Sequence, residues 1–265
     1  MASNASLSKA GISVCLLPSS VGSASKLQFA NTFLINGTVA IDAGSIGFHG
    51  TPQEQGRVRN VLLTHSHADH IASLPMLLIN DYEPGKDCIR VWATHATQEA
   101  LRAHVFNGVI WPDLEEIGTP ESPFIRWGDL VPEVPVEIEG LRFTPITVDH
   151  TVPTLAFLVE SQECSLVIGG DSAPTDELWR RARELNNLRA VFLEASFPNH
   201  ETELASVSKH LRPETFAEEV AKMPAGLPFY AVHLKPGPAQ QIEEELAQLG
   251  NPNIQVCVPG EEYVF

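Results

Sequence analysis

Four side chains that commonly bind metal ions lie within six residues of one another: His65, His67, Asp69 and His70. They directly follow the apolar run 61–63, which is typical of a buried strand. Because residues 65 and 67 are two apart, their imidazoles can converge on one ion, while Asp69 and His70 can face a second. Imidazole and carboxylate ligands together favour zinc, with manganese, iron or cobalt as alternatives. The chain has only ten histidines, and three are in this segment, which disfavours a casual surface cluster.

Three later apolar runs also end in a candidate metal ligand. They are followed by His150, Asp171 and His233, respectively. Taken singly, a strand-ending Asp or His is more often a turn former, but loops at a sheet edge commonly carry function, and the set predicts a site for two metals. Asp42 ends a fourth run. It could be a ligand, but we favour a carboxylate that accepts an N–H from a ligand histidine and so fixes the tautomer of that ring.

The elements that must position these residues alternate regularly along the chain. Strands are expected at residues 12–17, 32–35, 38–41, 61–63, 89–93, 141–148, 155–159, 166–168, 190–193 and 229–232, and near Ile254 and Tyr263, with helices over 69–80, 97–106, 175–185, 213–222 and 238–249. Asn36-Gly37 favours a tight hairpin turn, and Pro75 predicts a kink or break in the first helix. Hairpins followed by strand–helix units, in two similar halves, predict an α/β (α+β) fold in which two mixed β-sheets pack face to face with helices outside.

Residues 112–135 are rich in proline and acidic side chains. We predict a long loop over one face, rather than a linker between domains, because strands and helices of the same kind resume afterwards. Such a loop could cover the site as a lid or contact the second subunit of a homodimer.

Charge limits the partners of the chain. Lys and Arg total 17 against 33 Asp and Glu, a formal net charge of −16, which argues against binding to a nucleic-acid polymer or to an anionic membrane. A small anionic substrate remains suitable because two bound dications would dominate the field of a cleft.

The cysteines and the N-terminal segment point to no special compartment. The four cysteines are scattered and form no C-x-x-C pair, so buried free thiols are expected. Residues 1–10 lack a basic start followed by an apolar core, and no window of the sequence is apolar for long enough to span a membrane. We therefore expect a cytoplasmic protein.

The pattern H-x-H-x-D-H followed by strand-ending His, Asp and His resembles the ligand order of the metallo-β-lactamase-fold hydrolases, over residues 42–233. The resemblance implies an αββα sandwich formed as a single domain over residues 1–265. It would assign one metal to His65, His67 and His150 and the other to Asp69, His70 and His233, with Asp171 bridging the two.

Four short segments indicate a resemblance to one family within these hydrolases. Residues 65–75 are similar to the signature of class II cyclic-nucleotide phosphodiesterases, and residues 106–113, 194–199 and 206–213 resemble three further segments of that family. The chain departs from the family at three positions. They are Ala68 where Leu is usual, Ser73 where Gly is usual, and Lys209 where Gly usually precedes His210. None removes a ligand, but each could reshape the pocket.

The resemblance implies a dinuclear metal-dependent phosphodiesterase that opens cyclic AMP or cyclic GMP to the 5′-monophosphate. Two metals roughly 3.5–4 Å apart can hold an attacking hydroxide between them. Asp69 and Asp171 would orient it as ligands, and His210 is a candidate proton donor to the leaving oxygen, although a polar residue beside a helix start is an equally open interpretation. Phe106 and Trp111 could stack a base or pack in the core.

Two other functions stay open on the sequence alone. The same machinery could hydrolyse a lactone, a sulfate ester or a phosphotriester, because the superfamily includes several of these activities. The domain could also be a metal-binding sensor without catalysis, although intact ligands argue against that reading. A tRNA-sized substrate is disfavoured because the basic residues form no cluster that could bind an extended phosphate backbone.

Overall fold

The computed structural model describes residues 11–22 and 25–265, and in them two β-sheets of seven strands each. The first sheet has the order β14-β1-β2-β3-β4-β5-β6 and the second β13-β12-β11-β10-β9-β8-β7. The strands of the first sheet are β1 (Ser13–Leu16), β2 (Phe33–Ile35), β3 (Val39–Ile41), β4 (Asn60–Leu62), β5 (Arg90–Ala93), β6 (Arg126–Asp129) and β14 (Glu262–Val264). Those of the second are β7 (Val136–Ile138), β8 (Leu141–Val148), β9 (Thr154–Glu160), β10 (Ser165–Ile168), β11 (Leu188–Glu194), β12 (Phe229–Val232) and β13 (Ile254–Val256).

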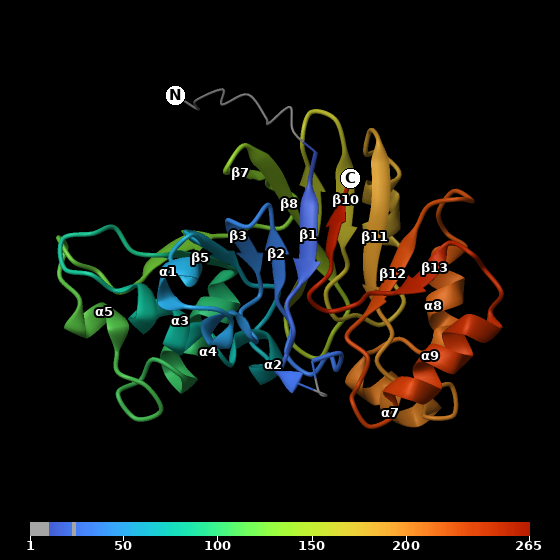
Figure 1. The fold of residues 1–265 in the computed structure, drawn as a ribbon, viewed down its shortest axis with the longest axis horizontal. Helices are drawn as coiled ribbons and strands as arrows, with labels where there is room; N and C mark the ends of the chain where they lie inside the picture. The colour runs from blue at the N-terminus through green and yellow to red at the C-terminus, as the bar shows by residue number, and fades with distance from the viewer. Residues whose placement is uncertain (1–10, 23–24) are drawn as a thin grey trace.

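Both sheets are mixed, and they are built alike. In the first, β1, β2 and β3 pair antiparallel, and β3 to β6 pair parallel. In the second, β7 to β10 pair antiparallel, and β10 to β13 pair parallel. The C-terminal strand β14 returns to the first sheet and pairs antiparallel with β1, as the red arrow beside β1 shows in Figure 1.

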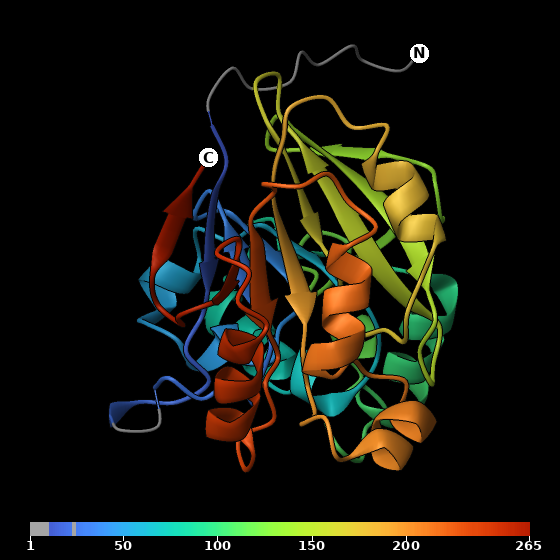
Figure 2. The same cartoon turned by 90° about the vertical axis from the view of Figure 1, so that its right-hand side faces the viewer.

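Helices cover the outer faces of both sheets (Figure 1). Beside the first sheet lie the 3₁₀ helix η2 (Ile46–Phe48), α1 (Pro52–Gln55), α2 (Ala68–Ile71), α3 (Leu74–Asp81), α4 (His95–His104) and α5 (Leu114–Ile117). Beside the second lie α6 (Glu177–Ala182), α7 (Thr202–Ser208), α8 (Pro213–Val220) and α9 (Ala239–Gln248). Figure 2 shows the orange and red helices in front of the second sheet.

Three apolar layers hold this arrangement together. The central layer fills the space between the two sheets and includes the buried rings of Phe33, Phe143 and Phe192. One outer layer packs α3 and α4 against the first sheet, and the other packs α6, α8 and α9 against the second. A sheet with an apolar layer on each face must be covered on both sides. The predicted αββα sandwich is therefore confirmed.

Two local expectations can be compared with the structure. The break predicted near Pro75 is present: the segment 69–80 forms α2 and α3, and Pro75 lies in the first turn of α3, where its missing N–H costs nothing. Residues 112–135 are not one long loop, since they contain α5 and the edge strand β6. Strand β6 was not predicted because its sequence, Arg-Trp-Gly-Asp, does not alternate between apolar and polar residues. Its Gly128 lies flat under Trp92, where a Cβ atom would come within 2.3 Å of the indole ring.

The thiols and the membrane prediction can also be compared with the structure. All four cysteines are free, but only Cys164 and Cys257 are buried, while Cys15 and Cys88 are half-buried. Burial raises the pKa of the Cys257 thiol to about 12, which keeps it unreactive. Within the described ranges, no helix has both the length and the apolar character needed to cross a bilayer. The expectation for residues 1–10 lies outside the described residues.

Candidate metal centre

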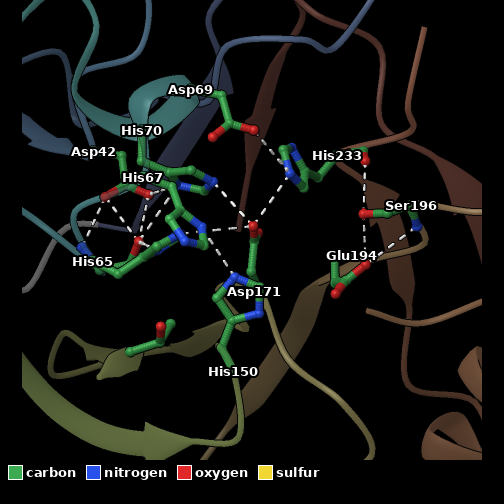
Figure 3. A network of polar contacts seen from close by, with 12 residues as sticks. Asp42, His65, His67, Asp69, His70, His150, Asp171, Glu194, Ser196 and His233 are labelled. Atoms are coloured by element: carbon green, nitrogen blue, oxygen red, sulfur yellow. Dashed lines mark hydrogen bonds and ion pairs between the residues drawn. The ribbon is translucent and has the colours of Figure 1, made fainter. Parts of the chain in front are cut away.

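The predicted ligands meet at one edge of the two sheets, although they come from four separate loops (Figure 3). His65 and His67 lie in the loop after β4, and Asp69 and His70 lie on α2. The other three follow β8, β10 and β12. Their ligand atoms form three sets within which all atoms lie within 4.8 Å of one another, namely His65, His67 and His150; His65, His70 and Asp171; and Asp69, His70 and His233.

The first set consists of three imidazoles that are ready to act as ligands. Nε2 of His150 lies 3.2 Å from Nδ1 of His67. Burial lowers the pKa of His65 well below its usual value, and it also lowers the pKa values of His67 and His150. The neutral ring, with its free lone pair, is the form that binds a metal. His150 can donate its Nδ1–H to the Lys209 carbonyl at 3.2 Å, which leaves its Nε2 for an ion.

Asp171 joins the second set to the first. Its Oδ2 atom lies 3.2 Å from Nε2 of both His70 and His233 and 3.9 Å from Nε2 of His65. Nε2 of His233 is also 3.5 Å from Oδ2 of Asp69. Burial alone would raise the pKa of Asp171, but His233 and His70 outweigh it and hold that pKa well below its usual range. The carboxylate is thus charged and centrally placed, as Figure 3 shows.

Asp42 supports two of the ligand histidines from behind. Its carboxylate lies 2.6 Å from Nδ1 of His70 and accepts hydrogen bonds from the backbone and hydroxyl of Thr64. With its proton given to Asp42, the Thr64 hydroxyl can accept from Nδ1–H of His65 at 2.9 Å. This network assigns tautomers that leave Nε2 of both rings facing the centre.

The pKa of His70 is shifted in the opposite direction to those of His65, His67 and His150. Burial alone would lower its pKa, but the carboxylates of Asp171 and Asp42 outweigh burial and raise that pKa well above the usual value. A metal ion that bound Nε2 of this ring would therefore displace a proton.

The donor set fits divalent metal ions. Nε2 of His65 and Oδ1 of Asp171 are buried and have no hydrogen-bond partner in the described structure. Leaving such an atom unpaired costs about 1–3 kcal/mol, which a cation between these atoms would relieve. Imidazole nitrogen and carboxylate oxygen suit Zn, Mn, Fe or Co.

The loop after β3 holds the ligand segment in place by close backbone contact. A Cβ atom on Gly44 would come within 2.1 Å of the Asp69 carbonyl, and one on Gly47 within 2.1 Å of the Ser73 carbonyl. Ser73 is buried, donates its hydroxyl to the Ala43 carbonyl and accepts from the backbone N–H of Gly47. This departure from the phosphodiesterase pattern therefore serves the fold, because the Ser73 hydroxyl is completely buried and its one proton is donated within the fold.

His210 lies against the candidate ligands, where the sequence had left its role open. Its ring centroid is 4.9 Å from that of His150 and 5.8 Å from that of His233. Nδ1 lies 2.8 Å from Oε1 of Glu194. Burial alone would lower the pKa of His210, but the Glu194 carboxylate outweighs it and raises that pKa. Helix α7, which the sequence did not predict, ends at Lys209 in the left-handed conformation and so turns the chain toward His210.

Glu194, in the segment 194–199, is a functional residue that the sequence did not predict. The carboxylate is buried and accepts hydrogen bonds from the backbone N–H groups of Ser172 and Ser196. The available signal was the same as for the ligands, because Glu194 directly follows the apolar run of β11. Phe106 is only 4% exposed and packs in the core, so it cannot stack a base.

The centre has a closed side and an open side. His65, His70, Asp171 and His233 are almost completely buried. In contrast, 29% of the Asp69 side chain is exposed. The open side of the centre is therefore lined by Asp69 and His67, which are both partly exposed. Lys235, a second residue that sequence reasoning missed, reaches this side of the centre.

Comparisons with known proteins agree with the fold. A family model described as "Beta-lactamase superfamily domain" matches residues 33–234. A Yersinia pestis protein named "Probable 3′,5′-cyclic-nucleotide phosphodiesterase" is 23% identical over 205 residues, 68% of this chain and 57% of the relative. A Mycobacterium bovis ribonuclease Z is 28% identical over 137 residues, 44% of this chain and 45% of the relative. The chain thus spans about half the length of these relatives.

A solved structure shows the same fold over almost the whole chain. Unliganded yeast PDE1 superposes with a TM-score of 0.74 at 17% identity, covering 97% of this chain and 99% of the yeast chain. Such a level of identity shows a shared fold and leaves the substrate undecided.

Proposed function

Because the chain belongs to the β-lactamase superfamily and has the hydrolase fold of that superfamily, we propose that it is a dinuclear metal-dependent phosphodiesterase that opens 3′,5′-cyclic nucleotides to 5′-monophosphates. The observation that carries this proposal is the pair of ligand sets joined by Asp171, with His210 against both. Two adjacent cation sites suit a phosphodiester, which has charge to neutralise on both the attacking and the leaving side.

In this proposal the two sheets share the metal ligands. His65, His67 and His150 would hold one ion and Asp69, His70 and His233 the other, and Asp171 would contribute to both sites. When bound, divalent ions supply a nucleophile from water at neutral pH and neutralise charge on the phosphate. Zinc is the expected metal, with manganese, iron or cobalt as alternatives. Asp69 and Asp171 orient the reacting groups, and Asp42 keeps the His70 ring in the required tautomer.

His210 gives a proton to the leaving 3′ oxygen in this proposal. Glu194 accepts from Nδ1 of the ring, so Nε2 is the atom that can transfer a proton to substrate. Because Glu194 raises the pKa of His210, the ring holds its proton up to a higher pH than burial alone would allow. Glu194 would therefore both position the ring of the general acid His210 and keep it protonated.

A small cyclic nucleotide suits the chain better than RNA, although ribonuclease Z is among the relatives. An RNA polymer binds through many Lys and Arg contacts to phosphates, whereas this chain has a formal net charge of −16. A cyclic nucleotide carries a single phosphate and needs cations only at the centre itself.

The proposal is tested by incubating zinc-loaded protein with cyclic AMP and cyclic GMP and identifying the products by chromatography. We expect the 5′-monophosphate, and we expect His67→Ala to abolish its formation. His200→Ala is the matched control, because that imidazole is exposed and lies outside the ligand sets. Turnover of a lactone, a sulfate ester or a tRNA precursor without turnover of either cyclic nucleotide would contradict the proposal. A hydrolysis rate unchanged in His67→Ala would instead support a metal-binding module without catalysis.

A further inference from the structure

Lys235 stands on a firmly held loop beside the centre. Its backbone N–H donates to the carbonyl of Ser196, and the carbonyl of His233, two residues earlier, lies 3.0 Å from the Ser196 hydroxyl. His233 itself adopts a positive φ of 60°, so the chain turns sharply as it leaves β12. The position of the Lys235 backbone is therefore fixed by β11 and its loop, and only the side chain is free to adjust.

The ammonium group reaches the open side of the centre. Nζ of Lys235 lies 3.4 Å from Oδ2 of Asp69 and 3.2 Å from Nε2 of His233. Among the described residues, no other Lys or Arg side chain contacts the side chain of a candidate ligand; Lys209 reaches only the backbone of His150. The side chain of Lys235, like that of Asp69, is 29% exposed.

The position of this charge matters because the rest of the chain repels anions. The formal net charge is −16, and the centre itself contains the carboxylates of Asp42, Asp69 and Asp171. Lys235 places a positive group on the solvent side of Asp69 and His233, where an entering anion can contact it. Partial burial strengthens that contact, because the effective dielectric is lower there than in bulk water.

We propose that Lys235 binds an anionic oxygen of the substrate and thereby selects esters that carry a negative charge. The proposal rests on the proposed function, in which the substrate is a phosphodiester. A metal ion held by Asp69 and His233 would occupy Nε2 of the imidazole that Lys235 now contacts, which leaves the N–H donors of the ammonium for the substrate. Lys235 is then a specificity residue for anionic over neutral esters.

Binding of inorganic phosphate to zinc-loaded protein tests the proposal without turnover. We expect Lys235→Met to weaken phosphate binding in calorimetry by roughly tenfold to a hundredfold, the usual effect of losing a charge-assisted hydrogen bond. Lys235→Arg should bind within about threefold of wild type. Lys86→Met is the matched control, because it removes the same charge from an exposed lysine that pairs with Asp81 away from the centre. Equal phosphate affinity in wild type and Lys235→Met would overturn the proposal, and so would a loss of binding that tracks a loss of zinc.

A pair of chromogenic esters with the same leaving group tests selection directly. Bis(p-nitrophenyl) phosphate is anionic, whereas diethyl p-nitrophenyl phosphate is neutral. We expect Lys235→Met to raise KM for the anionic ester about tenfold or more and to leave kcat/KM for the neutral ester unchanged. Equal losses on both esters would overturn selection by charge. If the wild type hydrolyses neither ester and no cyclic nucleotide, the proposed function fails, while the phosphate titration still decides the role of Lys235.

Discussion

The two sheets contribute to the centre in different ways. The first supplies His65, His67, Asp69 and His70 from one continuous segment that comprises the loop after β4 and helix α2. The second supplies His150, Asp171 and His233 from three loops that are far apart in sequence. The first group is assembled by local structure, whereas the second exists only when strands β8, β10 and β12 are correctly paired.

The groups that support the ligands differ in the same way. Behind the first group, Asp42 and Thr64 form one buried hydrogen-bonded unit with His65 and His70. Around the second group, separate loops hold one another through Ser196 and Lys209. We infer that the first group is intrinsically ordered and that the second depends on contacts between loops. Substitutions in each group can test that difference.

The largest effect is expected where the two groups meet. Asp171→Asn removes the charge that lies 3.2 Å from Nε2 of both His70 and His233. Because metal ions contribute several kcal/mol to the transition state, and 1.4 kcal/mol is a factor of ten, hydrolysis should fall about a thousandfold or more. Steady-state kinetics and metal analysis measure this loss. Asp176→Asn, at an exposed aspartate, should leave the rate unchanged, and a modest loss in Asp171→Asn would mean that the two sets do not share this ligand.

The second largest effect is expected at Asp42, which supports the first group. Asp42→Asn weakens the acceptor that orients His70 directly and His65 through Thr64. Loss of such a partner typically lowers metal affinity about 10–100-fold. Competition against a chromogenic zinc chelator would measure the change, with Asp176→Asn again as the control. Unchanged zinc affinity would show that the first group needs no support from Asp42.

A smaller effect is expected at Ser196, which supports the second group. The Ser196 hydroxyl lies 2.7 Å from Oε2 of Glu194 and 3.0 Å from the His233 carbonyl, and it is completely buried. Ser196→Ala should lower the free energy of unfolding of the metal-free protein by about 1–3 kcal/mol, because a buried acceptor loses its donor. Urea denaturation measures this, and Ser206→Ala on the exposed face of α7 should cost nothing. Equal stability of Ser196→Ala and wild type would remove Ser196 from the link between the loops.

The smallest effect is expected at Lys209. The residue has a positive φ of 57°, and its Nζ pairs with Asp149 at 2.7 Å in an exposed position. Lys209→Gly relieves about 1–2 kcal/mol of backbone strain, but it loses an ion pair worth about 0–1 kcal/mol and makes the unfolded chain more flexible. The net change in unfolding free energy should be within about 1 kcal/mol. Lys209→Ala keeps the strain and loses the pair, so it should be less stable than Lys209→Gly; the reverse order would show that the strain is absent.

The difference between the two groups also explains which features could be predicted from the sequence. The segment from His65 to His70 is contiguous, so its spacing alone indicates metal binding. The fold followed from the order of hairpins and strand–helix units, because each element has its own periodicity. His150, Asp171 and His233 were visible as strand-ending residues, but only the paired strands bring them together.

The remaining features depend on contacts that carry no local pattern. The pairing of Glu194 with His210 joins residues on two loops, and the contact of Lys235 with Asp69 crosses from one half of the molecule to the other. Strand β6 forms because β5 offers it a partner, not because its side chains alternate. Short elements of this kind are set by tertiary context.

The most direct test of the joint metal centre is calorimetric titration of metal-free protein with zinc. We predict that two zinc ions bind per chain, and that His150→Ala, which removes a ligand of one ion only, leaves one tightly bound ion. Binding of a single ion to the wild-type chain would contradict a centre shared by the two sheets.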